Sequence, residues 1–262
     1  MGTLHENKII WITGASSGIG RALAEFYAKP GVTLGLVARR TDKLNKVATY
    51  CRTLGASVYI YGADVRDSME IRMAANDFLS KVGSVDTIIA NAGIRAEEGQ
   101  DYIDGELPLN VINTNFIGVI HTFAPFIPIM RDKKSGHLVV ISSIAAFRGT
   151  QNSGLYSASK AAVNVWTESL RLRLKPFGIH VSTLCAGFVD TEMTKEIAFS
   201  MPGLLNAKEA AKAIDYGIRH HKRVYIFPWQ SRLIWTLFRI LPGPIYDIII
   251  TWAKKNHPTR KS

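Results

Sequence analysis

Seven short apolar runs alternate with longer segments of helical periodicity along this chain. The runs occupy residues 8–13, 32–38, 57–62, 85–90, 137–142, 180–185 and 224–227. Between the first runs, residues 18–28 and 41–54 place their apolar side chains along one helical stripe. Buried runs interleaved with helices favour βαβ units and a parallel sheet. We therefore predict a single doubly wound α/β domain, with helices on both faces of a seven-stranded parallel sheet.

Composition limits the other classes of protein. With 262 residues, nearly half of them apolar, the chain can bury one large core. Cys51 and Cys185 lie far apart, so we expect two reduced thiols, and no zinc-like spacing of ligands predicts a metal site. No apolar signal stretch precedes residue 8, so we expect a cytoplasmic protein. The net charge of +11 is concentrated after residue 218, which argues against nucleic acid as a partner.

A glycine-rich stretch, TGASSGIG, follows the first predicted strand and spans Thr13–Gly20. Its glycines, at 14, 18 and 20, would let the backbone approach a pyrophosphate at the N-terminus of the next helix. Ser16 and Ser17 add hydroxyl donors. The spacing differs from the common G-x-G-x-x-G fingerprint, but the physical arrangement is the same. This stretch predicts a dinucleotide site.

Two arginines follow the second predicted strand. An enzyme that prefers NAD commonly has an acid here, which bonds the ribose 2′-hydroxyl. This chain has Ala38 at that point, followed by Arg39 and Arg40. Guanidinium groups attract a 2′-phosphate that an acid would repel. The pattern therefore predicts NADP(H), without deciding which of the two arginines contacts the phosphate.

Tyr156 and Lys160 stand one helical turn apart in the stretch YSASK. Residues four apart are neighbours on a helix surface. With the glycine-rich stretch and Asn-Ala-Gly at 91–93, the pair makes the chain resemble the classical short-chain dehydrogenase/reductase family from residue 8 to about residue 228. The resemblance implies a Rossmann-like domain that transfers a hydride between NAD(P)(H) and an alcohol or carbonyl. It also implies a homodimer or homotetramer.

The resemblance assigns roles residue by residue. The implied catalytic residues are Asn115, Ser143, Tyr156 and Lys160, with Ser142 a less favoured neighbour of Ser143. The cofactor-binding set is Gly14, Ser16, Ser17, Gly18, Ile19, Gly20, Arg39, Arg40, Asp64, Val65, Asn91, Ala92, Gly93, Tyr156, Lys160, Gly187, Val189 and Thr191. One departure is Ala186-Gly187, where the family has Pro-Gly, and it predicts a looser loop.

The chemistry of these residues suggests a mechanism. A free tyrosine, with a pKa near ~10, is a poor acid at neutral pH. We expect Lys160 and an oxidised nicotinamide to lower the pKa of Tyr156 toward the working pH. Ser143 would bond the substrate oxygen, and Asn115 would hold a water that returns the proton through Lys160, as the resemblance implies.

Residues 188–205 follow the sixth predicted strand, where the family has a substrate lid. The segment is rich in apolar side chains: Phe188, Met193, Phe199, Met201, Leu204 and Leu205. An apolar lid favours a lipophilic substrate. We expect Phe188 and Met193 to contact the substrate together with Ser143 and Tyr156.

Residues 229–262 extend beyond the 1–228 catalytic domain. From Arg219 onward the chain has nine Lys or Arg and one acid, Asp247, among apolar residues and tryptophans. Pro-Gly-Pro at 242–244 divides this stretch, which is too interrupted to cross a bilayer. Residues 229–255 predict an amphipathic hairpin at a membrane surface. A dimer interface and a cover over the substrate cleft are the alternatives.

These observations lead to one main functional hypothesis. We expect an NADP(H)-dependent oxidoreductase for the carbonyl or alcohol group of a lipid-, steroid- or retinoid-like molecule. A soluble reductase of 3-oxoacyl groups on a carrier protein is the alternative among enzymes, since a basic tail suits an acidic carrier. A binding protein that senses NADPH is the alternative outside enzymes, and the intact catalytic set argues against it.

Overall fold

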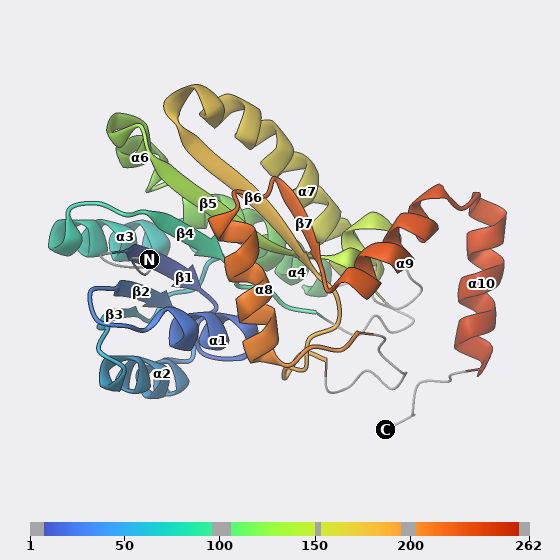
Figure 1. Ribbon diagram of the computed structural model, residues 1–262, viewed down its shortest axis with the longest axis horizontal. Helices are drawn as coiled ribbons and strands as arrows, with labels where there is room; N and C mark the ends of the chain where they lie inside the picture. Colours follow the sequence, from blue (N-terminus) through green and yellow to red (C-terminus); the bar gives the residue numbers. More distant parts are fainter. Residues whose placement is uncertain (1–7, 96–105, 150–152, 195–202, 257–262) are drawn as a thin grey trace.

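One parallel sheet forms the centre of the protein (Figure 1). The computed structural model describes residues 8–95, 106–149, 153–194 and 203–256. The strands follow the order β3-β2-β1-β4-β5-β6-β7, and each neighbouring pair is parallel. Their bounds are β1 (Ile9–Thr13), β2 (Thr33–Val37), β3 (Ser57–Tyr61), β4 (Thr87–Ala90), β5 (Gly136–Ser143), β6 (Ile179–Ala186) and β7 (Val224–Phe227). The predicted seven-stranded, doubly wound fold is confirmed.

Helices cover both faces of the sheet. One face packs on α1 (Gly18–Tyr27), α2 (Thr41–Thr53) and α8 (Ala207–Arg219). The other packs on α3 (Ser68–Val82), α5 (Gly118–Phe123) and α7 (Gly154–Leu174). The connecting elements are α4 (Leu107–Ile112), the π-helix η1 (Asn113–Ile117), α6 (Ile127–Lys133) and the 3₁₀ turns η2 (Ile144–Phe147) and η3 (Lys175–Phe177). Two separate cores result.

Alternation along β1 shows how the sequence supplies both cores. Ile10 and Ile12 point into the core on the α1 face, whereas Trp11 points into the other. Trp11 is fully buried, and its ring lies 5.1 Å from that of Phe126. Gly35 of β2 is the residue that pairs with Trp11 of β1. A Cβ atom on Gly35 would lie 2.5 Å from the Trp11 indole. A strand buried on both faces therefore needs a glycine beside its largest side chain.

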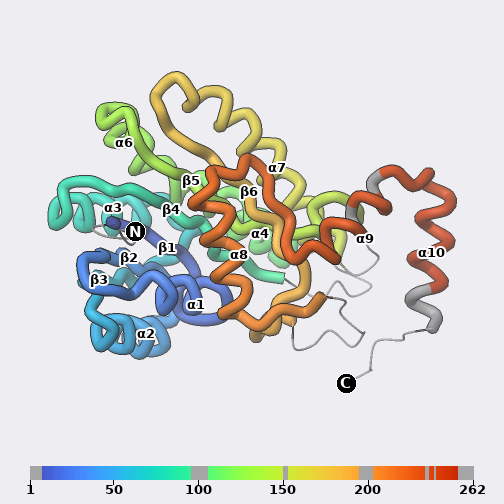
Figure 2. The backbone as a smooth tube through the Cα atoms, in the orientation of Figure 1, coloured from blue at the N-terminus to red at the C-terminus, as the bar shows by residue number. Residues whose placement is uncertain are grey.

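Two further helices follow β7. These are α9 (Trp229–Ile240) and α10 (Gly243–Asn256), separated at Pro242 as the Pro-Gly-Pro sequence predicts. The backbone tube shows α10 standing apart from the sheet and its covering helices (Figure 2). The beginning of α9 lies beside the end of β6. A Cβ atom added to Gly187, the residue after β6, would meet the side chain of Ser231 on α9.

Three histidines meet at the amino edge of the sheet, away from the strand ends that carry the predicted site. His137 on β5 pairs with His180 on β6, and the His180 ring stacks on His221 at 3.9 Å. The buried His137 shares a 2.7 Å hydrogen bond with the Ser182 hydroxyl. Burial, and then the neighbouring His221 and His180, lower the pKa of His137 to about 3.

The depressed pKa of His137 predicts a loss of stability in acid. The unfolded chain binds a proton below a pKa of about 6.5, but the folded protein does not until about 3. Stability from this group is therefore complete above pH ~6.5 and falls as the pH decreases toward ~3, by about 2 kcal/mol between pH 7 and pH 5. Urea unfolding of wild type and His137→Gln at the two pH values measures this.

The variant should show about 2 kcal/mol less pH dependence than wild type, whatever its stability at neutral pH. His220→Gln is the matched control, because His220 is exposed at the end of α8. Equal pH dependence in wild type and His137→Gln would refute the assignment.

Candidate active site

The glycine-rich turn after β1 is locked to the loop after β4. The Asn91 side-chain amide donates to the carbonyl oxygens of Thr13 (3.0 Å) and Gly14 (3.3 Å). The Thr13 hydroxyl accepts from the backbone N–H groups of Asn91 and Ala92. Gly14 has φ +68°, and a Cβ there would lie 2.9 Å from the Ala92 Cα. Only glycine fits this approach, which leaves the first N–H groups of α1 for an anion.

The other residues of the turn bring α1 and the loop after β6 together. A Cβ on Gly20 would lie 2.2 Å from the Gly14 carbonyl oxygen, so the helix can start directly against the turn. Gly18 has φ +53° and faces the Thr191 side chain. Ile19 packs against the core on the α1 face. The predicted phosphate-binding residues thus border one backbone cradle.

A basic corner lies beside this cradle. Arg40 donates to the Ser17 hydroxyl (2.5 Å) and to the Ser16 hydroxyl (3.4 Å). Arg40 and Lys43 also pair with the two oxygens of the Glu192 carboxylate, each at 2.9 Å. These two cations, Lys43 first, lower the pKa of Glu192 to about 2. The Glu192 carboxylate therefore occupies a position that would suit a phosphate group. The cations and serine hydroxyls around it fit a phosphorylated dinucleotide.

The loops after β2 and β3 contribute a mixed group. Arg39 lies 3.5 Å from the Asp64 carboxylate, which is bonded more closely by Arg66 at 2.7 Å. Val65 is buried, and its carbonyl oxygen lies 2.9 Å from the His121 ring nitrogen. Asp64 and Val65 are therefore placed at the carboxyl edge, with the Val65 side chain part of the core.

Ser143, Tyr156 and Lys160 come together at the end of β5. Ser143 ends the strand, and its side chain acts to lower the pKa of the Tyr156 phenol. Lys160 lies one turn further along α7, with its Nζ 5.9 Å from the Tyr156 ring centroid. Its ammonium group is buried and donates to the Ile141 carbonyl oxygen at 2.9 Å. Ser142 instead donates to the Asn164 side chain and points elsewhere.

Asn115 reaches the same place from the other side. It is fully buried in η1, a π-helical turn of a kind often found at functional sites. Its side chain accepts from the Ile94 N–H (2.8 Å) and donates to the Ile94 carbonyl (2.9 Å) and the Ser159 hydroxyl (3.0 Å). A Cβ on Gly93 would lie 3.3 Å from the Asn115 Oδ1 and 3.6 Å from the Lys160 Nζ.

Burial opposes the expected lowering of the Tyr156 pKa. Burial raises the pKa of Tyr156, while the hydrogen bond from Ser143 and the charge of Arg95 only oppose this. Burial also lowers the pKa of Lys160 to about 8. Lys160 directs its ammonium group at the Ile141 carbonyl. The lowering expected when an oxidised nicotinamide adds its positive charge beside the phenol stays a prediction.

The loop after β6 begins with two contacts of Gly187, and its predicted looseness relative to a Pro-Gly loop stays a prediction. Gly187 donates to the Phe227 carbonyl at 2.7 Å, and its Cα packs on Ser231. Val189 is buried and bridges to Leu205. The half-buried Phe188 and the exposed Met193 lie on this loop. Phe199 and Met201 of the predicted lid lie outside the described residues.

Several polar partners were missed by sequence reasoning. Ser159 bridges Asn115 to the Tyr156 carbonyl, and its place between the two motif residues was the available signal. Lys43 and Glu192 also belong to the basic corner. The sequence indicated only a helix surface for Lys43 and a loop for Glu192. Among the residues that the structure describes, no cluster of three His, Cys, Asp or Glu could hold a metal ion.

Comparisons with known proteins show which family has this fold and sequence. Residues 8–201 match the family described as short chain dehydrogenase. An oxidoreductase of Myxococcus xanthus (strain DK1622) is 34% identical over 90% of this chain and 93% of its own length. The 11-beta-hydroxysteroid dehydrogenase-like 4A of Arabidopsis thaliana is 33% identical over 95% and 84%.

A solved structure agrees with this. The short chain dehydrogenase/reductase from Burkholderia phymatum, in complex with NAD, superposes with a TM-score of 0.78 at 27% identity. The superposition covers 86% of this chain and 90% of that one. The parallel sheet, the locked glycine-rich turn and the Ser143–Tyr156–Lys160 cluster thus accompany a family match over most of the chain, and the protein is an oxidoreductase of the short-chain dehydrogenase family.

Proposed function

We propose that the protein is an NADP(H)-dependent reductase, or the reverse dehydrogenase, of the carbonyl or alcohol group of a lipophilic molecule. The observation that carries this is the convergence of Ser143, Tyr156 and Lys160 at the strand ends beside the glycine-rich cradle. When bound, the nicotinamide cofactor supplies or accepts the hydride.

The chain's own residues would handle the proton. Tyr156 gives its phenolic proton to the substrate oxygen during reduction, and takes one back during oxidation. The Ser143 hydroxyl, which acts to lower the pKa of the phenol, would orient that oxygen and stabilise charge on it. Asn115 and Lys160 flank Gly93 on the inner side, where a relay that returns the proton would run. Lys160 would also hold the ribose hydroxyls.

The basic corner supports NADP(H) as the cofactor. Arg39 and Arg40 follow the end of β2, and Lys43 shares the Glu192 carboxylate with Arg40. Ala38 at the strand end offers no acid to a ribose 2′-hydroxyl. Arg40 already contacts both serine hydroxyls of the turn. Bidentate bonds from guanidinium to phosphate would favour the 2′-phosphate.

The loop after β6 supports a lipophilic substrate. Phe188 and Met193 follow Gly187, and Met193 and Leu204 remain exposed at 40% and 45%. Apolar side chains on a loop at the carboxyl edge of the sheet favour a substrate with an apolar body. The name of the Arabidopsis relative, which refers to a hydroxysteroid, points the same way.

The same proposal covers organisation and location. Residues 1–228 would form the catalytic domain, with residues 229–262 as an added element. We place the enzyme in the cytoplasm at a membrane surface, reached through residues 229–255, where lipophilic substrates concentrate. Assembly into a homodimer or homotetramer stays a prediction.

Tyr156→Phe tests the proposed acid. The variant should retain NADPH binding, measured by cofactor fluorescence, and lose about 10²–10⁴-fold in kcat for a ketone. Tyr50→Phe is the matched control, because Tyr50 is half exposed on α2. Turnover that persists in Tyr156→Phe would exclude Tyr156 as the acid, and equal loss in the control would point to damaged folding.

Arg39→Gln/Arg40→Gln tests the cofactor. Each lost charge-assisted hydrogen bond weakens binding by about 1.5–3 kcal/mol, so the Kd for NADPH should rise about 100-fold while the Kd for NADH changes little. The two single variants show how much of the rise in the Kd for NADPH comes from each arginine. Lys46→Gln removes an exposed cation from α2, the helix that follows the two arginines, as a control. Equal losses for NADPH and NADH would overturn the NADP(H) assignment.

A series of 2-alkanones of increasing chain length tests the substrate class. With NADPH oxidation as the readout, kcat/KM should rise by up to about fourfold per methylene while the chain is buried. Met193→Ser should flatten this slope. Met69→Ser, at a residue 63% exposed on α3, should not change it. A flat series in the wild type would refute the lipophilic substrate.

A further inference from the structure

The helices after β7 expose an unusual number of large apolar side chains. We call them the apolar stripe: Trp229, Leu233, Leu237 and Ile240 on α9, and Ile245, Ile248 and Trp252 on α10. Their exposed fractions run from 47% to 72%. Spacings of three and four place each set on one side of its helix. Apolar surface of this kind in a folded protein marks a contact with something else.

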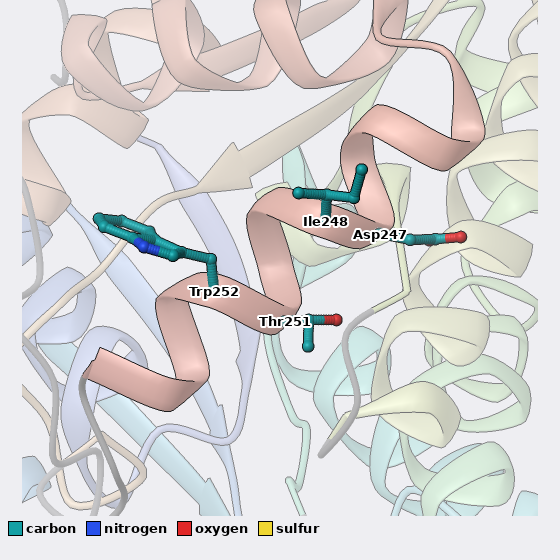
Figure 3. A pocket seen from close by; sticks show the side chains of 4 residues that line it. All are labelled: Asp247, Ile248, Thr251 and Trp252. Carbon is teal, nitrogen blue, oxygen red and sulfur yellow. The ribbon is translucent and has the colours of Figure 1, made fainter.

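A close view of α10 shows how the two kinds of side chain separate (Figure 3). Ile248 and Trp252 project from one side of the helix, and Asp247 and Thr251 project from another. Together the four line an open hollow of about 400 Å³. The apolar side of α10 is therefore formed and uncovered within the part of the chain that the structure describes.

The hairpin is fastened to the body at its turn. The Arg148 guanidinium donates to the carbonyl oxygens of Phe238 and Leu241, which end α9. It also lies 4.5 Å over the Tyr246 ring, and the Tyr246 hydroxyl donates to Gly149 at 2.8 Å. Tyr246 is buried, whereas Ile245 and Ile248 beside it are exposed. The stripe is thus held outward by specific contacts.

Charge identifies the kind of partner. From Arg219 to the end, nine basic residues face one acid, which gives this part of the sequence a charge of +8, against +3 for the rest. The extension itself, residues 229–262, has six Lys or Arg and one Asp, a charge of +5, and two extensions of this charge would repel each other in a self-paired dimer. An anionic lipid surface attracts each Lys or Arg near it by about 1 kcal/mol. Charge complementarity therefore favours lipid over a second copy.

The dimensions favour binding on a membrane rather than across it. With 12 and 14 residues, α9 and α10 are about 18 and 21 Å long, short of the ~30 Å hydrocarbon core. Trp229 and Trp252 lie near the two ends of the stripe, and tryptophans prefer the headgroup region. By length and composition Leu107–Lys133 could cross a membrane, but Phe123, Phe126 and Met130 in it lie in the core.

We propose that the apolar stripe docks this protein onto the surface of an anionic lipid bilayer. The stripe would sink into the headgroup boundary while the basic residues of the extension meet the lipid phosphates. This deepens the proposed function, on which it rests only for the idea that the docked enzyme takes a lipophilic substrate. Docking itself depends on α9 and α10 alone.

Co-sedimentation with vesicles tests this on the full chain. Wild type should pellet with vesicles of equal parts phosphatidylglycerol and phosphatidylcholine, less so at high salt, and stay in solution with phosphatidylcholine alone. Leu233→Glu/Ile248→Glu should lower the bound fraction by at least about tenfold, since each buried apolar side chain contributes about 1.5–3 kcal/mol. Met69→Glu/Met73→Glu, at residues 63% and 66% exposed on α3, is the matched control and should bind as wild type does.

Circular dichroism and turnover of a short soluble ketone without vesicles should be unchanged in both variants, which separates failed docking from failed catalysis. Wild type that ignores anionic vesicles would overturn the proposal, and so would equal binding by the two double variants. If the stripe variant instead changes the oligomer in gel filtration while vesicle binding persists, the stripe is a subunit interface and the proposal is wrong.

Discussion

The candidate site depends on the hydrogen bonds that the Asn91 side chain donates to the carbonyl oxygens of Thr13 and Gly14. The sheet order reverses there, because β1 pairs with β2 on one side and β4 on the other. A parallel sheet opens a crevice at such a reversal. Asn91 closes the base of the crevice by tying the two strand ends, and so fixes the glycine-rich turn and the N-terminus of α1. The phosphate cradle and the catalytic side of the site are thereby one rigid unit.

Lys160, in contrast to Asn91, has few hydrogen-bond partners for its buried polar group. Its ammonium group is buried with the Ile141 carbonyl as a hydrogen-bond partner, and burial lowers its pKa to about 8. A buried cation with so few acceptors is poorly solvated. Ribose hydroxyls would add acceptors where Gly93 leaves open backbone beside the Nζ. Burial therefore acts on both members of the pair, since it lowers the pKa of Lys160 and raises the pKa of Tyr156.

How far the sequence predicts the molecule depends on the range of each interaction. Strand positions came from apolar runs and the α9–α10 break from Pro242, because backbone geometry is local. Motif spacing located the candidate site. It could not show that Glu192 pairs with Arg40, 152 positions away, or that Arg148 caps α9. Those contacts arise where loops from different strands meet. The upward shift in the pKa of Tyr156 was missed for the same reason, since it comes first from burial by distant segments.

The proposed docking surface and the proposed catalytic centre share one short stretch of backbone. Ser143 ends β5, its hydroxyl accepts from the Ala145 N–H in η2, and Arg148 follows directly to cap α9. α9 also contacts η2 itself. The orientation of the hairpin is therefore set relative to the serine that would orient the substrate. An apolar stripe is unfavourable in water until something covers it. If a bilayer covers this one, the membrane surface and the Ser143 hydroxyl take a fixed relation, and a lipophilic carbonyl could pass between them with little exposure to water.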